Sequence, residues 1–189
     1  GLRCHNRIPF KRGLGSSAAA IVGGLTAANL LISRTDHGPF PERDLLRWAV
    51  HLEGHPDNAA AALLGGCQIV VWEGERAVTA AVPVPDNLRA VVFIPDVPMP
   101  TGRAREVLPA KVAREDAVYN IGRVALLVRA LSTGDFTHLA LATDDRLHQP
   151  ARQTIFPAMK NIFRAALGAG ALGVFLSGAG SSVLALTRG

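Results

Sequence analysis

The sequence is poor in cysteine and in aromatic side chains. Among 189 residues there are two cysteines, and Phe, Trp and Tyr together account for 5%. Cys4 and Cys67 are too few and too far apart for a disulfide framework or a thiolate metal site, so we expect a reduced, cytoplasmic protein. With so few aromatic rings, the core has to be built from small aliphatic side chains and closely packed backbone, which suits mixed helix and sheet.

Long apolar segments are missing as well. The longest apolar runs, such as residues 61–72, are interrupted by glycine and glutamine and are too short to span a membrane. No signal peptide is visible. At 49% hydrophobic residues, the chain can still bury the core of one domain or of two small ones. It starts at Gly1, without Met, on a segment that looks like the middle of a domain, so we expect a fragment.

Acidic residues are fewer than basic ones, and the formal net charge is +5. The basic residues are scattered along the chain, and no stripe of aromatic and basic side chains accompanies them. A nucleic-acid surface is therefore weakly supported. A site for a small anionic or phosphorylated ligand explains the charge as well.

Hydrophobic periodicity and turn residues predict a series of helices and strands. Helices are expected over residues 16–31, 42–52, 58–64, from 114 to about 131, 135–143 and 154–170. A β-hairpin over residues 67–84 should turn at Glu73 and Gly74, and residues 87–98 should form a strand in the centre of a sheet. Residues 173–186 read as strand, glycine turn and strand. We place a domain boundary near residues 85–88, which gives domains of residues 1–86 and 87–189.

Residues 9–20, "PFKRGLGSSAAA", form a glycine-rich loop that opens a helix. The free backbone N–H groups at a helix N-terminus lie at the positive end of the helix dipole and can bind phosphate. Gly13 and Gly15 let the backbone approach a ligand closely, and the two serines offer hydroxyls to a phosphate oxygen or to Mg²⁺. The alternative is an ordinary capped helix with tight glycine packing. The loop is neither a Gly-Lys-Ser/Thr P-loop nor a dinucleotide fingerprint.

Residues 51–58, "HLEGHPDN", form a second polar cluster. Two carboxylates with an adjacent carboxamide can hold Mg²⁺ and orient a hydroxyl nucleophile. A zinc pair of His51 and His55 is a rival, but metalloproteases place the Glu directly after the first His on an unbroken helix. A third interpretation is that Asp57 and Asn58 only cap the next helix.

A third glycine cluster, residues 176–182, "LSGAGSS", joins two predicted strands. A tight hairpin could use such a loop. It could equally pack its glycines against another nucleotide-binding loop.

Together these motifs resemble the GHMP kinases, the family of galactokinase, mevalonate kinase and homoserine kinase. "PFKRGLGSSAA" is similar to the Pro-x-x-x-Gly-Leu-Gly-Ser-Ser-Ala-Ala motif of that family. "EGHPDN", "PTGRAREVLP", "HQPAR" and "LSGAGSSVLAL" resemble segments of the homoserine kinases in particular. The resemblance implies an α+β, two-domain fold with a truncated ribosomal-S5-like N-terminal domain and a ferredoxin-like C-terminal domain, and ATP lying between them.

The resemblance also implies roles for individual residues. ATP phosphates would be held by residues of the first motif, which are Pro9, Lys11, Arg12, Gly13, Leu14, Gly15, Ser16, Ser17 and Ala18. Mg²⁺ would be bound by Ser17 and Glu53, and the implied catalytic residues are Asp57, Asn58 and Thr101. L-homoserine would contact His55, Asn58, Arg105 and Arg152, the two arginines through its carboxylate. The alternative for both arginines is a solvated surface salt bridge.

Two positions depart from the homoserine kinase pattern, and one segment is absent. Ala151 stands where an aromatic residue is usual, and Ser181 with Ser182 replaces Pro-Thr. Nothing corresponds to the family's N-terminal strands. The expected activity is ATP-dependent phosphorylation of L-homoserine in threonine biosynthesis, without nucleic acid or membrane partners and with a homodimer left open. Another GHMP small-molecule kinase, or a catalytically incomplete nucleotide-binding fragment, are the alternatives.

Overall fold

The computed structural model describes residues 3–189 and contains two compact units. The first combines the N-terminal segment up to Ile8 with Gly15–Pro83, and the second combines Pro9–Leu14 with Val84–Gly189. The glycine-rich segment of residues 9–20 is therefore divided between the two units after Leu14.

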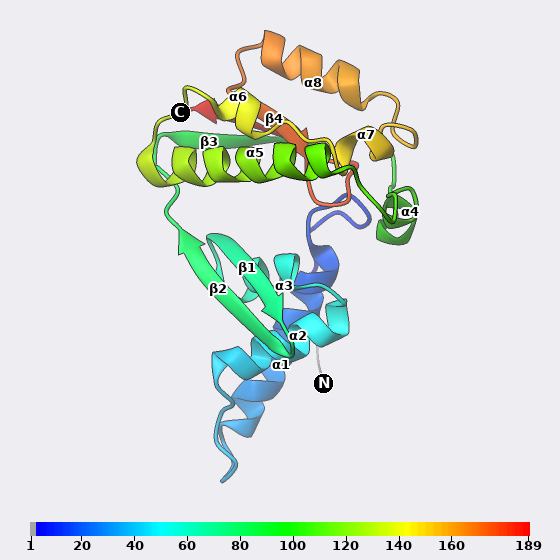
Figure 1. Ribbon diagram of the computed structural model, residues 1–189. Coiled ribbons are helices and arrows are strands. Elements are labelled where there is room, and N and C mark those ends of the chain that lie inside the picture. Colours follow the sequence, from blue (N-terminus) through cyan, green and yellow to red (C-terminus); the bar gives the residue numbers. More distant parts are fainter. Residues whose placement is uncertain (1–2) are drawn as a thin grey trace. The chain divides into compact units, whose positions relative to one another are not determined.

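The first unit packs three helices against a two-stranded antiparallel sheet (Figure 1). Its elements are α1 (Ser16–Ile32), α2 (Glu42–Glu53), α3 (Pro56–Leu64), β1 (Cys67–Glu73) and β2 (Arg76–Val82). Small side chains such as Ala49, Ala59 and Ala60 are fully buried where the helices meet, so the helices approach closely. Alternation along the strands turns Val70 and Ala77 toward this core.

The second unit is built on a three-stranded antiparallel sheet with the order β3-β5-β4. Its elements are β3 (Leu88–Phe93), α4 (Thr101–Glu106), α5 (Arg114–Thr133), α6 (Leu139–Ala142), α7 (Gln149–Arg152), α8 (Met159–Gly168), β4 (Gly173–Leu176) and β5 (Val183–Arg188).

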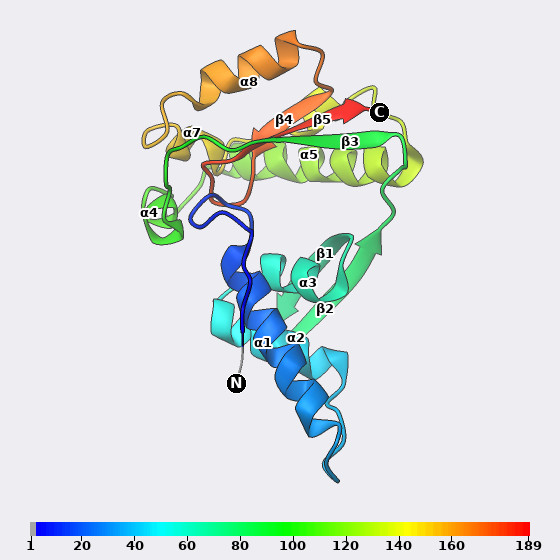
Figure 2. The same cartoon turned by 180° about the vertical axis from the view of Figure 1, so that it is seen from behind.

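The two faces of this sheet pack against different helices. Val174, Leu176 and Val183 share a cluster with the α8 side chains, whereas Phe175 and Leu186 share one with α5 and α6. Figure 2 shows α5 and α8 lying apart, with the strands running between them. The period-2 alternation of side chains in a strand produces these two clusters.

Most of the predicted elements are confirmed. Helices begin at Ser16, Glu42 and Arg114 as expected, and the hairpin forms, with its turn at Gly74 and Glu75. The prediction that residues 87–98 lie in the centre of a sheet is wrong, because β5 is central and β3 is an edge strand. Only residues 139–142 of the helix predicted over 135–143 are α-helical, and α8 begins after Pro157. The short helices α4 and α7 were not predicted.

Within residues 3–189, no helix is both long and apolar enough to cross a membrane.

Candidate active site

The N-terminus of α1 lies within the glycine-rich motif. Gly15 is the N-cap residue at φ 71°, a left-handed conformation that favours glycine. Because glycine has no side chain, nothing on the N-cap residue itself can accept from the first N–H groups of the helix. The Ser16 hydroxyl accepts a hydrogen bond from Asn6 Nδ2 at 3.1 Å. The first N–H groups of α1 are thus left without a side-chain cap from the N-cap residue, and phosphate binding there stays a prediction.

Ser17 and Glu53 meet although they are far apart in the sequence. Ser17 Oγ donates to Glu53 Oε2 at 2.7 Å, and the Glu53 side chain is only 8% exposed. Two oxygen donors side by side are suited to Mg²⁺, which takes few protein ligands and completes its shell with water and phosphate oxygens. No cluster of three or more His, Cys, Asp or Glu that could hold a metal occurs within the described residues.

His55 lies between two carboxylates. Helix α2 ends at Glu53, Gly54 adopts φ 80°, and His55 is extended, so His51 and His55 do not share one continuous helix. His55 Nδ1 is 2.6 Å from Asp57 Oδ1, and its Nε2 is 3.8 Å from Glu53 Oε1. The imidazole therefore orients Asp57, whose side chain remains 71% exposed and open to a ligand.

Asn58 lies beside the start of α1. A Cβ placed on Gly15 would be 3.8 Å from Asn58 Cγ and Oδ1, an ordinary van der Waals distance. Asp57 Oδ1 accepts from the backbone N–H of Asn58 at 2.7 Å, and the N-cap residue of α3 makes no side-chain capping bond. Asp57, in the first turn of α3, thus satisfies one of the free N–H groups at the start of that helix, as the capping interpretation expects. The predicted roles of Asp57 and Asn58 in catalysis stay predictions.

In the second unit, the two glycine-rich loops pack directly against each other. Ser177 Oγ donates to the carbonyl oxygen of Gly13 at 2.9 Å, and the backbone N–H of Ser182 donates to the carbonyl oxygen of Arg12 at 3.1 Å. A Cβ on Gly13 would lie 2.1 Å from the carbonyl oxygen of Ser177, closer than any real contact. Residues 177–182 thus pack against another glycine loop, and they also join the antiparallel strands β4 and β5 as a hairpin loop, so both interpretations of this segment hold.

The basic pair of the first loop has two different environments. Arg12 Nη2 forms an ion pair with Asp96 Oδ1 at 3.0 Å, which ties the loop to the segment after β3. Lys11 is exposed and adopts φ 55°, which is uncommon for a residue other than glycine. Its carbonyl oxygen accepts from the backbone N–H of Met99 at 3.0 Å. Pro9 is exposed, and Leu14 is half-buried.

Arg152 is a buried cation that forms no salt bridge within the described part of the chain. The residue is 9% exposed, its Nε donates to the carbonyl of Ala104 at 3.3 Å, and its Nη1 donates to that of Gly178 at 2.9 Å. Burial lowers the pKa of Arg152, the charge of Asp145 raises it, and the charge of Arg105 lowers it. A solvated surface salt bridge is therefore wrong for this arginine.

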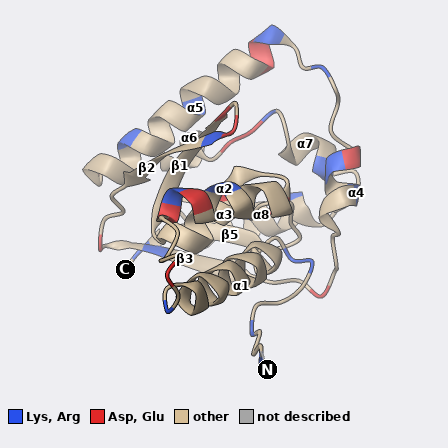
Figure 3. Cartoon of the chain, turned by 90° about the horizontal axis from the view of Figure 1, so that it is seen from below, with Lys and Arg blue, Asp and Glu red and all other residues tan. Residues whose placement is uncertain are grey.

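Arg105 is the second predicted carboxylate ligand, and it lies on α4. This helix begins at Thr101 after Pro100 and carries Arg103, Arg105 and Glu106 in its last turn (Figure 3). Arg105 is exposed, and its charge acts on Arg152. The predicted binding of a carboxylate by Arg105 and Arg152 stays a prediction.

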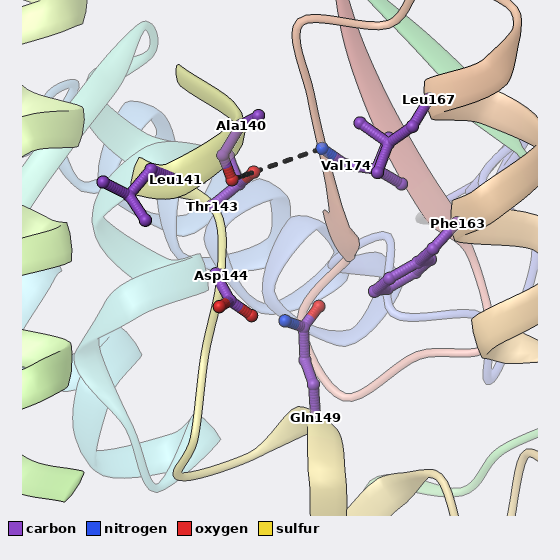
Figure 4. A pocket seen from close by; sticks show the side chains of 8 residues that line it. All are labelled: Ala140, Leu141, Thr143, Asp144, Gln149, Phe163, Leu167 and Val174. Atoms are coloured by element: carbon purple, nitrogen blue, oxygen red, sulfur yellow. Dashed lines mark hydrogen bonds between the residues drawn. The ribbon is translucent and has the colours of Figure 1, made fainter. Parts of the chain in front are cut away.

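Sequence reasoning missed Asn6, Asp96, Asp145 and Ser177. Each of these residues contributes through a contact with a residue remote in the chain, and no local pattern marks such a contact. It also missed a cavity of about 330 Å³ beside α7 (Figure 4). Gln149 and Asp144 lie at one end, with Phe163, Leu167 and Val174 along its side. None of the predicted site residues lines it.

Comparison with known proteins gives the family of this chain. Residues 1–66 match the GHMP kinases N terminal domain, and residues 127–189 match the GHMP kinases C terminal domain. The chain belongs to the GHMP kinases. Its α+β architecture of two small antiparallel sheets with helices is that of this family of kinases.

Several similar GHMP kinases are homoserine kinases. The one from Moorella thermoacetica is 46% identical over 188 residues, which cover 100% of this chain and 62% of that protein. The one from Gloeobacter violaceus is 49% identical over 181 residues, covering 96% and 59%. The crystal structure of homoserine kinase from Cytophaga hutchinsonii matches with a TM-score of 0.85 and 36% identity, covering 96% of this chain and 58% of that one. The chain thus spans about 60% of the length of these relatives.

Proposed function

We propose that this chain carries the nucleotide and acceptor sites of a homoserine kinase, which transfers the γ-phosphate of ATP to the hydroxyl of L-homoserine. The buried guanidinium of Arg152, which forms no salt bridge with the residues that the structure describes, is the observation that carries the choice of acceptor. A buried cation needs an anionic partner, and a homoserine carboxylate accepts two parallel hydrogen bonds from one guanidinium fork. The names of the relatives support the same acceptor.

ATP phosphates bind at the N-terminus of α1, where free N–H groups and the helix dipole favour negative charge. Residues 9–18 form the cradle, and Gly15 lets its backbone adopt the required left-handed turn. Ser17 and Glu53 fit Mg²⁺, because their oxygens are already 2.7 Å apart. When bound, Mg²⁺ neutralises charge on the phosphate oxygens.

Phosphoryl transfer then depends mainly on positioning. The homoserine hydroxyl oxygen forms the new bond to the γ-phosphorus, the bond from that phosphorus to the bridging oxygen breaks, and ADP leaves. Asp57 accepts the hydroxyl proton, since its carboxylate is exposed and held by His55. Asn58 and Thr101 are the residues that the family resemblance implies for positioning the acceptor.

The test is a substrate panel with ATP and Mg²⁺, measuring ADP release. We expect release with L-homoserine and none above background with mevalonate, because the relatives that match nearly the whole chain are homoserine kinases. Phosphorylation of mevalonate but not of homoserine would contradict the proposal and favour another GHMP small-molecule kinase.

A further inference from the structure

Asp145 precedes α7, the four-residue helix that ends at Arg152. Its Oδ2 accepts from the backbone N–H of His148 at 2.8 Å and from that of Gln149, and its Oδ1 accepts from the backbone N–H of Leu147 at 3.0 Å. A helix of one turn is too short to be stable by itself. The Asp145 carboxylate supplies the missing acceptors and sets where α7 begins.

The Asp145 side chain is itself anchored to α5. Asn120 Nδ2 donates to Asp145 Oδ1 at 2.7 Å, and Asn120 Oδ1 accepts from the backbone N–H of Arg146 at 3.0 Å. The Asp145 side chain is 14% exposed. Side chains of α5 pack against the sheet, and α5 is the longest helix of the unit. Asn120 therefore links the start of α7 to a helix that is held in place by the core.

The far end of α7 is equally constrained. Gln149 Oε1 accepts from the backbone N–H of Leu176 at 2.8 Å, which ties α7 to β4, and Figure 4 shows Gln149 at the end of the cavity near that strand. Arg152 then reaches the carbonyls of Ala104 and Gly178. Asp145 is also the acidic group whose charge raises the pKa of Arg152. The Asp145 carboxylate therefore affects this guanidinium in two ways: it holds the start of the helix that carries Arg152, and its charge acts on Arg152.

We propose that Asp145, held by Asn120, is a positioning residue for acceptor binding, because it fixes the helix that presents the buried guanidinium of Arg152. The inference rests on the proposed function, since it takes Arg152 to be the group that binds the acceptor carboxylate. It assigns Asp145 no contact with substrate. The expected effect of removing it is therefore on acceptor affinity.

Asp135 offers a matched control. Its carboxylate accepts from the backbone N–H of Thr137 at 3.1 Å and from Arg129 Nη1 at 2.8 Å, in a turn that precedes α6. Asp135→Asn is thus the same chemical change at another capping carboxylate, one that does not contact α7.

The experiment compares Asp145→Asn and Asp135→Asn in steady-state kinetics and by NMR. For Asp145→Asn we expect the KM for L-homoserine to rise about tenfold or more, with the KM for ATP changed less than about twofold. Asp135→Asn should leave both constants unchanged. Asn120→Ala should also raise the homoserine KM. This second variant tests the inference if Asp145→Asn does not fold.

Exchange of the Arg152 Nε–H with solvent gives a readout that is independent of activity. It should become at least about tenfold faster in Asp145→Asn, or in Asn120→Ala, and remain unchanged in Asp135→Asn. If the wild-type chain phosphorylates homoserine but Asp145→Asn and Asp135→Asn have the same homoserine KM, the inference is overturned. If the wild-type chain phosphorylates no homoserine, the proposed function fails, and unchanged Arg152 exchange in Asp145→Asn overturns the positioning role separately.

Discussion

Ser17 Oγ donates a hydrogen bond to Glu53 Oε2 at 2.7 Å, and this contact joins the start of α1 to the end of α2. The carboxylate is nearly buried, so the pair is a fixed feature of the first unit. The distance between these two oxygens gives the magnesium proposal a geometric basis that neither residue has alone.

Glu53→Gln should weaken the binding of Mg²⁺ without unfolding the protein. The substitution preserves side-chain volume but removes the negative charge that a hard cation requires. We expect the Mg²⁺ concentration for half-maximal activity to rise about tenfold or more, measured by titrating Mg²⁺ at fixed ATP. Ser33→Ala is the control, because Ser33 Oγ donates only to the carbonyl of Leu30 at the other end of α1. An unchanged Mg²⁺ requirement in Glu53→Gln would rule Glu53 out as a ligand.

Gly13→Ala should disrupt the packing of the two glycine loops. The new Cβ would lie 2.1 Å from the Ser177 carbonyl oxygen, so the loop has to move. Gly38→Ala is the matched control, since Gly38 also has a positive φ but has open space around it. Both variants share a strain of about 1–2 kcal/mol. Only Gly13→Ala should also raise the calorimetric Kd for ATP, by about tenfold or more. Equal Kd values in the two variants would show that the loop contact has no part in ATP binding.

Arg152→Lys should raise the KM for the acceptor. Lysine keeps the charge but loses the planar fork and the Nε–H that donates to the Ala104 carbonyl. Lost hydrogen bonds to a charged group are worth about 1.5–3 kcal/mol, so the homoserine KM should rise roughly tenfold to a hundredfold. Arg103→Lys, an exposed change on α4, should leave it unchanged. A homoserine KM that is the same in both variants would argue against carboxylate binding by Arg152.

Asp145 should make stability depend on pH in the acid range. Burial raises the pKa of Asp145, but hydrogen bonds from His148, Gln149 and Asn120 outweigh it and leave the pKa well below the ordinary value of 3.8. A carboxyl whose pKa is lower in the folded state stabilises fully above its unfolded pKa, and this contribution is lost as the pH falls below it. His148 Nδ1 lies 3.6 Å from Asp145 Oδ1, and the charge of Asp145 also acts on Arg152.

Asp145→Asn should remove that dependence. At pH 7 it should lower the free energy of unfolding by about 1 kcal/mol, as the loss of a helix cap does. The difference from wild type should shrink as the pH falls below 4, measured by urea denaturation at each pH. A difference that is constant with pH would contradict the prediction.

Leu139→Ala should destabilise the second unit strongly. Leu139 is completely buried in the cluster formed by α5, α6 and the sheet. The cavity left behind should cost about 2–5 kcal/mol of unfolding free energy. Leu141→Ala on the same short helix is the control, because Leu141 is 46% exposed and should change the stability far less. Chemical denaturation of the two variants compares them directly, and similar losses would show that this cluster is not a main source of stability.

The local elements could be predicted, whereas their environments could not. The α5 periodicity correctly gave a helix from Arg114, yet Ile121 on its predicted apolar face is 68% exposed, and Ala130 on another face is buried. A helix with apolar residues around more than one face does not determine which face packs. Likewise, the apolar run of β3 suggested a central strand, but β5 occupies the centre because it pairs with both β3 and β4.

By itself, the sequence determined the chemistry of the motifs, since glycine spacing, serine hydroxyls and a helix start are local properties of neighbouring residues. It also determined where the main helices and the hairpin begin. Only the tertiary structure decided that Ser17 meets Glu53, that Ser177 packs on Gly13, and that Arg152 is buried against backbone carbonyl groups. Each of these depends on contacts between residues dozens of positions apart, and the packing of whole helices and strands brings such residues together.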